Sequence, residues 1–172
     1  MKLQLFALTL LVSTLGLGES LKVMGRDYTY SCGYFSSMVG DYDITFKDES
    51  LPWGTKVTLI YGWDTEQWRE KPERKEWKYR EEKVMKAVSP FTWSKQIETT
   101  LHSRTEAEFK KALNIVIKIE EPKQAVRYFN GGSPWGFFRT EVGNPSKAPC
   151  IDRDKKKPEF YDRRLEVVTR RD

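Results

Sequence analysis

The chain has 172 residues, of which 38% are hydrophobic and 32% are charged, and its formal net charge is +5. This length suits a single domain and excludes a TIM barrel or a two-domain dinucleotide-binding enzyme. An aromatic content of 13% argues against disorder, and one histidine with two cysteines leaves too few ligands for a His/Cys metal site. We therefore expect neither a metal nor a cofactor.

The beginning of the chain has the pattern of a secretory signal peptide. Lys2 precedes an apolar run over residues 3–15, which is followed by small residues. The apolar run is too short to span a membrane comfortably, so we expect no transmembrane segment in the mature chain. The sequence predicts a signal peptide over residues 1–20, with cleavage after Gly18 or after Ser20 both open. The mature protein is expected to be secreted or periplasmic.

Export brings the cysteines into an oxidising compartment, where disulfides persist. Cys32 and Cys150 are the only two cysteines, so they form the only intrachain pair that the sequence allows. Closing a loop of this size stabilises a fold by about 4–5 kcal/mol in the chain-entropy model. We predict this disulfide; the alternative is a pair of buried thiols.

The region that follows has the two-residue period of β-strands. Apolar or aromatic side chains alternate with polar ones in several short runs, at residues 28–32, 42–46, 56–63, 91–100 and 113–119. Residues 125–129 and 136–142 have the pattern of a hairpin, and turns rich in Gly, Pro and Asn separate the runs. Short strands with regular turns predict an all-β sandwich or barrel over residues 21–150.

Three segments depart from this period. Residues 65–86 are densely charged and are compatible with either a charged hairpin or a short helix. Thr105 and Glu108 have the spacing of a capping box, which allows a short helix before Leu113. Residues 151–172 are strongly charged and are predicted to form a C-terminal tail.

No motif in the sequence carries catalysis. The carboxylates mostly alternate with basic residues, as on a solvated face, and no pair has the isolation that an acid/base mechanism needs. A nucleophile elbow and a phosphate-binding glycine loop are both absent from the sequence. We expect no catalytic residue. Export and the interspersed acidic residues also argue against binding of nucleic acid.

Aromatic recognition is the site chemistry that the sequence supports best. Trp53 and Trp135 lie in turns with Gly and Pro, where a ring either packs over a sheet edge or faces solvent. Exposed rings stack on the apolar faces of sugars, while nearby polar side chains bond the hydroxyls. We expect at least one of Trp68, Trp77 and Trp135 to be exposed.

Three stretches of the sequence together resemble a starch-binding type of carbohydrate-binding module. They are residues 56–64 followed by Trp68, residues 91–97 around Trp93, and residues 113–119 followed by the aromatic-Asn-Gly-Gly turn at 128–132. The resemblance covers about ninety residues, from 52 to 142. It implies a secreted immunoglobulin-like β-sandwich. It also implies Trp63, Trp68 and Trp93 as stacking residues and Asn130 as a hydrogen-bonding residue.

The function that these patterns favour is non-catalytic binding of a polysaccharide or another glycan. The predicted ligand-binding residues are Trp63, Trp68, Trp93, Asn130 and Trp135. The alternative is a structural or protein-interaction component of the cell envelope, in which the charged segment and the basic tail contact a protein or an anionic surface.

Overall fold

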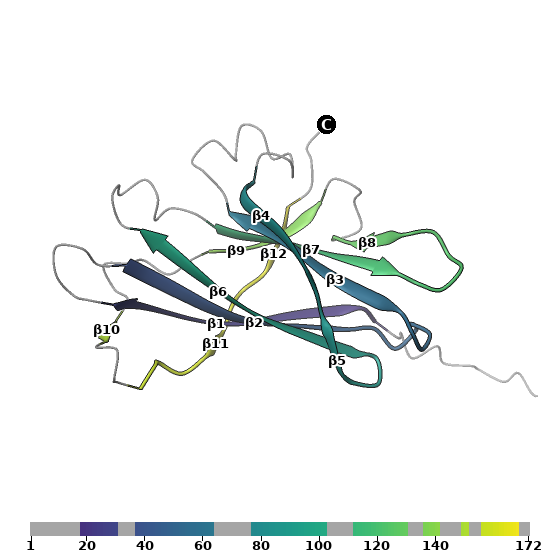
Figure 1. Cartoon of the computed structure of the whole chain (residues 1–172), viewed down its shortest axis with the longest axis horizontal. Helices are drawn as coiled ribbons and strands as arrows, with labels where there is room; N and C mark the ends of the chain where they lie inside the picture. The colour runs from purple at the N-terminus through teal and green to yellow at the C-terminus, as the bar shows by residue number, and fades with distance from the viewer. Residues whose placement is uncertain are drawn as a thin grey trace, which may run out of the picture.

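The computed structural model describes residues 18–30, 37–63, 77–102, 112–130, 136–141, 149–151 and 156–168. These residues form two β-sheets that pack against each other, with no helix among them (Figure 1). The predicted all-β sandwich is confirmed. Most of the segment that allowed a short helix lies outside the described residues, and its last residues, Ala112 and Leu113, begin a strand. Within the described part, no helix is long and apolar enough to span a membrane.

The first sheet has the strand order β10-β1-β2-β6-β5, and β11 adds to β1. Its long strands are β1 (Ser20–Tyr30), β2 (Ser37–Lys47) and β6 (Thr92–His102). The short strands at its edges are β5 (Lys86–Ser89), β10 (Cys150–Ile151) and β11 (Tyr161–Asp162). The pairing of β10 with β1 is parallel, and the other pairings of this sheet are antiparallel.

The second sheet has the strand order β12-β9-β7-β3-β4, and β8 adds to β7. Its central strands are β3 (Lys56–Trp63) and β7 (Ala112–Glu120). The others are β4 (Lys78–Val84), β8 (Arg127–Phe129), β9 (Phe137–Glu141) and β12 (Glu166–Val168). All ladders in this sheet are antiparallel. Of the segment 65–86, predicted as a charged hairpin or a short helix, residues 78–84 form β4 and pair with β3, and residues 65–76 lie outside the described part.

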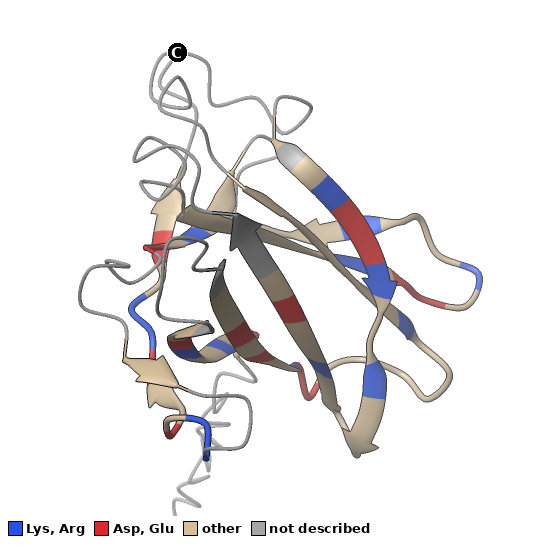
Figure 2. Cartoon of the chain, turned by 60° about the vertical axis from the view of Figure 1, so that its left-hand side comes forward, with Lys and Arg blue, Asp and Glu red and all other residues tan. Residues whose placement is uncertain are grey.

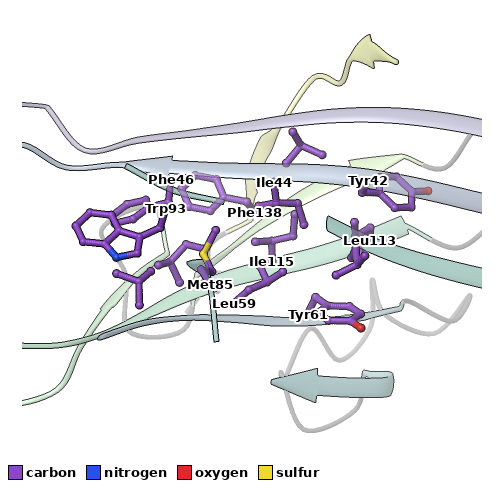
Figure 3. Packing of buried hydrophobic residues seen from close by; sticks show 14 of the residues in the cluster. Tyr42, Ile44, Phe46, Leu59, Tyr61, Met85, Trp93, Leu113, Ile115 and Phe138 are labelled. Carbon is purple, nitrogen blue, oxygen red and sulfur yellow. The ribbon is translucent and has the colours of Figure 1, made fainter. Parts of the chain in front are cut away.

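The core lies between the sheets and follows from the alternation seen in the sequence. Side chains of β2 meet those of β3, β7 and β9 in one cluster (Figure 3), which includes Tyr42, Ile44, Phe46, Leu59, Leu113, Ile115, Ile117 and Phe138. Each large apolar side chain removed from water in this way contributes about 1.5–3 kcal/mol. A smaller cluster of Ile60, Trp77, Val116 and Phe137 covers the outer face of the second sheet.

The edge strand of one sheet continues into the edge strand of the other. Strand β4 ends at Val84 and β5 begins at Lys86, so Met85 alone joins them. The Met85 side chain is buried in the core, and its backbone N–H donates to the Val57 carbonyl at 2.9 Å. The charges of β4, which Figure 2 shows following one another along the strand, discourage further strands from pairing at this edge.

The hairpin predicted from residues 125–129 and 136–142 is wrong. Strands β8 and β9 do not pair with each other; both pair with β7, at opposite ends of it. Ile117 lies opposite Phe129, and Ile115 lies opposite Phe138. The two short strands are thus one strand along β7, interrupted by a seven-residue insertion at 130–136. The Gly-rich composition that resembled a turn belongs to this insertion.

The segment predicted as a charged tail takes part in both sheets. Residues 156–168, here called the C-terminal strap, place β11 on the edge of β1 and β12 on the edge of β9. The strap therefore crosses from one sheet to the other, as the yellow trace in Figure 1 shows. At the other end of the chain, β1 begins at Ser20, the last residue of the predicted signal peptide. Residues 1–17 lie outside the described part.

Two buried carboxylates hold the strap, one on each face of the first sheet. On the inner face, Arg163 is ion-paired with Asp27, which also accepts a hydrogen bond from Tyr161 at 3.0 Å. On the outer face, Lys157 lies 3.2 Å from Asp41. Gly25 makes the inner contact possible, because a Cβ atom there would collide with the Arg163 side chain.

The two carboxylates also bond tyrosines across the ladder between β1 and β2. Tyr42 donates to Asp27 and Tyr28 donates to Asp41, both at 3.3 Å. Burial first, and then the charge of Asp27, raises the pKa of Tyr42 well above its usual value, and the same causes raise the pKa of Tyr161 to about 12. The strap is therefore fixed by charge-assisted bonds at the sheet edge rather than by its short strands alone.

Replacing Arg163 tests this anchorage. We expect Arg163→Met to lower the free energy of unfolding by about 3–5 kcal/mol, because it leaves the buried Asp27 carboxylate without its cation. Asp27→Asn combined with Arg163→Met should recover part of the loss. Urea denaturation measures the difference. Arg164→Met is the control, since Arg164 is exposed; equal effects of Arg163→Met and Arg164→Met would contradict the anchoring role.

Candidate functional site

Three turns meet at one end of the sandwich, at the right of Figure 1. They are the β2–β3 loop (residues 48–55), the β5–β6 turn (residues 90–91) and the β7–β8 loop (residues 121–126), which together we call the turn end. The Asp48 N–H donates to the Phe91 carbonyl at 3.0 Å, which joins the first two turns. Pro122 approaches Gly54 closely enough to contact a Cβ atom built there, which places the third turn beside the first.

Asp48 is the centre of this arrangement. Its carboxylate is fully buried, and it accepts bonds from the Ser50 N–H at 2.9 Å and the Ser50 hydroxyl at 2.6 Å. The second carboxylate oxygen accepts from Arg127 at 2.7 Å. Burial alone would raise the pKa of Asp48, but the bonds from Ser50 and Arg127 outweigh it and lower that pKa below its usual value.

Arg127 links this carboxylate to two others. It donates to Glu121 of the β7–β8 loop at 3.1 Å and is ion-paired with Glu19, immediately before β1. Burial opposes the charged form, but the bonds to these carboxylates raise the pKa of Arg127 above its usual value. One guanidinium therefore ties together the start of the first strand and two of the three turns.

Trp53 stands on the β2–β3 loop, with 94% of its side chain exposed. The loop beneath it is fixed: Leu51 is buried, and the Pro52 carbonyl accepts bonds from the Thr55 hydroxyl at 2.7 Å and the Thr55 N–H at 3.3 Å. Gly54 has φ of +86°, a conformation that glycine adopts without strain. The indole is therefore held out by an ordered turn.

Other apolar side chains of the turn end and the adjoining strand β8 are half exposed. Phe91 is 44% exposed, Val126 47% and Tyr128 45%. Phe91 and Lys123 both have positive φ values, +61° and +63°, so each sits at a tight point of its turn. Large exposed apolar side chains on turns are features of binding surfaces rather than of stability.

The charges around the turn end balance. Within the turn end itself, Asp48, Glu49 and Glu121 stand against Lys123; with the flanking Glu19, Lys47, Lys56, Lys118, Glu120 and Arg127 included, there are five acidic and five basic residues. Several are paired on the surface: Lys47 with Glu49 at 2.5 Å, and Lys56 with Glu120 at 3.1 Å. The bonds from Lys56 and Lys118 lower the pKa of Glu120. A surface of this kind selects neither anions nor cations.

The structure corrects the predicted role of three residues. Trp63, Trp93 and Asn130 are buried, with exposed fractions of 2%, 7% and 3%. The Trp63 ring lies 6.0 Å from the Tyr42 ring. The Trp93 ring lies 6.1 Å from the Phe46 ring, beside it in Figure 3. Both indoles belong to the core and present no face to a ligand. The reason is the strand period, which places Trp63 on the same face as Leu59 and Tyr61.

The remaining predicted ligand-binding residues, Trp68 and Trp135, lie outside the described residues. Trp77, which we named with them as a candidate for exposure, is 7% exposed and packs edge-on against Phe137 at 5.0 Å. The most exposed tryptophan of the described part is Trp53, which was not among the predicted binding residues. Its signal in the sequence is the tripeptide Pro52-Trp53-Gly54, because a ring in such a turn cannot enter the middle of a sheet.

A cavity of about 330 Å³ opens at the strap, away from these turns. Its charged lining consists of Arg139, Arg163, Arg164, Glu141, Asp162 and Glu166. Arg139 lies 3.6 Å from Glu141 and 4.0 Å from Glu166, and Arg163 is held by Asp27. Since the lining charges cancel and its two buried cations, Arg139 and Arg163, are already paired, this cavity is a weaker candidate than the turn end. Among the described residues, no three His, Cys, Asp or Glu side chains converge as metal ligands would.

Comparison of the chain with protein-family models, with curated proteins and with solved structures gave no match. Its function is therefore inferred from its own residues.

Acid titration tests the role of Asp48. When folding lowers the pKa of a carboxyl group, the folded state is stabilised at pH values above the pKa of that group in the unfolded chain, which is about 4. This stabilisation is lost as the pH falls through the lower pKa of the folded state. We expect Asp48→Asn to be less stable than wild type at about pH 7 and to lose less on acidification to about pH 3. Urea denaturation across this range gives both quantities.

Glu49→Gln provides the control, since Glu49 is exposed and pairs only with Lys47 among the ion pairs of the described residues. Its stability should follow the wild-type dependence on pH. Curves for Asp48→Asn and wild type that run parallel would contradict a structural role for the Asp48 carboxylate.

Proposed function

We propose that the protein is an exported, non-catalytic binding module that takes an uncharged glycan chain at the turn end, with a sugar ring stacked on Trp53. The observation that carries this proposal is the exposure of Trp53 on an ordered turn. Export is supported by the apolar run that follows Lys2 in the sequence.

An exposed indole on an ordered turn suits this ligand for two reasons. Its flat apolar face matches the C–H face of a pyranose, and covering both surfaces removes them from water. The backbone of the turn that carries the ring is already ordered, so little backbone entropy is lost on binding. Ser50, Lys123 and Gln124 are exposed on the same turns and supply polar groups for sugar hydroxyls.

The balance of charges supports an uncharged ligand in particular. An anionic polymer or an acidic membrane surface would be attracted by an excess of basic residues, which the turn end lacks. Binding governed by stacking and neutral hydrogen bonds changes little with salt, because screening acts on charges.

The strand order supports an immunoglobulin-like topology as part of the proposal. The order β1-β2-β6-β5 facing β4-β3-β7-β9 corresponds to strands A-B-E-D facing C′-C-F-G of that fold. In this correspondence the β2–β3 and β7–β8 loops occupy the places of the B–C and F–G loops. Those loops form the ligand-binding end of variable domains.

Titration with neutral polysaccharides tests the site. The full mature protein would be titrated with a panel of soluble neutral glucans, mannans and xylans, monitored by tryptophan fluorescence at low and high salt. We expect saturable binding to one class, little changed by salt. Trp53→Ala should weaken it at least about tenfold, which corresponds to about 1.4 kcal/mol, without changing the unfolding midpoint.

Tyr79→Ala is the matched control, since Tyr79 is an aromatic residue 68% exposed at the beginning of β4, outside the turn end. Its affinity should equal that of wild type. Binding that survives Trp53→Ala would remove Trp53 from the site. Absence of binding to every glycan would overturn the proposal and favour the envelope-protein alternative.

The predicted disulfide belongs to the same proposal, because export would supply the oxidising compartment. Cys150 lies opposite Thr29 in the parallel ladder between β10 and β1. Cys32 lies outside the described residues, two positions beyond the end of β1 at Tyr30. Cys150 therefore lies beside Thr29, three residues before Cys32 in the sequence, which supports this pairing.

Reduction tests this bond. The mass of the exported protein should be two hydrogen atoms below that of its dithiol form. The double variant Cys32→Ser/Cys150→Ser should have a free energy of unfolding lower by about 2–5 kcal/mol, as measured by urea denaturation. Free thiols titratable in the unfolded, unreduced protein would show that the cysteines do not pair.

A further inference from the structure

The residues just before and at the beginning of β1 belong to the folded domain. Ser20 pairs with Lys47 at the end of the ladder between β1 and β2. Glu19 is ion-paired with Arg127, the guanidinium that also holds Asp48 and Glu121. Both residues fall within the predicted signal peptide, and the sequence leaves cleavage after Gly18 and after Ser20 open.

The cluster around Arg127 has an excess of negative charge. Three carboxylates, from Glu19, Asp48 and Glu121, share a single guanidinium. The Asp48 carboxylate is fully buried and the Glu121 carboxylate is 12% exposed, so solvent screens this excess only in part. A further cation at this place would be stabilising.

We propose that the signal peptide is removed between Gly18 and Glu19, and that the new α-ammonium of Glu19 completes this cluster. The proposal rests on the proposed export. A signal peptidase would hydrolyse the Gly18–Glu19 peptide bond with one water molecule, leaving a carboxylate on Gly18 and an ammonium group on Glu19. Gly16 and Gly18 provide the small side chains that such an enzyme accepts at the third and first positions before the cut.

The alternative cut, after Ser20, would damage the turn end. It would remove the Glu19 carboxylate from Arg127 and the first paired residue of β1. Cleavage after Gly18 keeps both contacts and adds a positive charge on the residue that already contacts the cluster. Of the two cuts that the sequence leaves open, only the one after Gly18 preserves the contacts of Glu19 and Ser20.

The first test uses the full chain with its own leader, produced in a host that exports it. Intact mass and amino-terminal sequencing identify the first residue of the mature protein. We expect Glu19. A mature chain that begins at Leu21, or at any other residue, would overturn the proposed site. A chain that keeps Met1 through Gly18 would overturn both this inference and the export proposal, while glycan titration would still test the binding site separately.

The second test measures the role of the cluster by comparing chains that begin at Glu19 and at Leu21, each in wild-type and Arg127→Met backgrounds. In the wild-type background, the longer chain should unfold at a higher urea concentration. In the Arg127→Met background this difference should shrink, leaving only the contribution of the Ser20 pairing. A difference of equal size in both backgrounds would overturn the link between Glu19 and the cluster.

Discussion

The ion pair between the buried Asp48 carboxylate and the partly exposed Arg127 organises one whole end of this sandwich. Asp48 fixes its own turn through Ser50 and reaches the β5–β6 turn through its backbone N–H. Arg127 extends the same network to the β7–β8 loop and to Glu19. Turns are usually the most variable and mobile parts of a β-sandwich. Here Asp48 and Arg127 together make three of them one ordered surface, and this order presents Trp53 to solvent on a well-defined turn.

Along its two lateral sides, the fold protects the edges of its sheets, where backbone groups would otherwise be unpaired. Along one side, the chain passes from β4 to β5 through Met85, so both edges there belong to a single strand with charged residues. Along the other side, the C-terminal strap covers the edges of β1 and β9. Its short strands offer few backbone bonds. Asp27 and Asp41 compensate by holding Arg163 and Lys157 on the two faces of the first sheet.

The tryptophans show why composition alone could not place the site. Trp63 and Trp93 were predicted as stacking residues from a family resemblance, yet both lie in the core. The period of the strand carried the correct information, since Trp63 alternates in phase with Leu59 and Tyr61. The sequence around Trp53 indicated exposure instead, because its neighbours Pro52 and Gly54 place it in a turn. Local sequence therefore distinguished a core indole from an exposed one more reliably than the order of aromatic motifs along the chain.

Local alternation by itself determined the all-β class and the approximate positions of several strands, because a two-residue period needs no distant partner to be recognised. The sequence predicted a strand over residues 56–63, and β3 has the same bounds. Only the tertiary structure decided that β8 and β9 are one interrupted strand along β7, that the charged C-terminal segment closes the sandwich, and that Asp48 meets Arg127. These arrangements join residues far apart in the chain, and charge pairing across such distances leaves no periodic trace in the sequence.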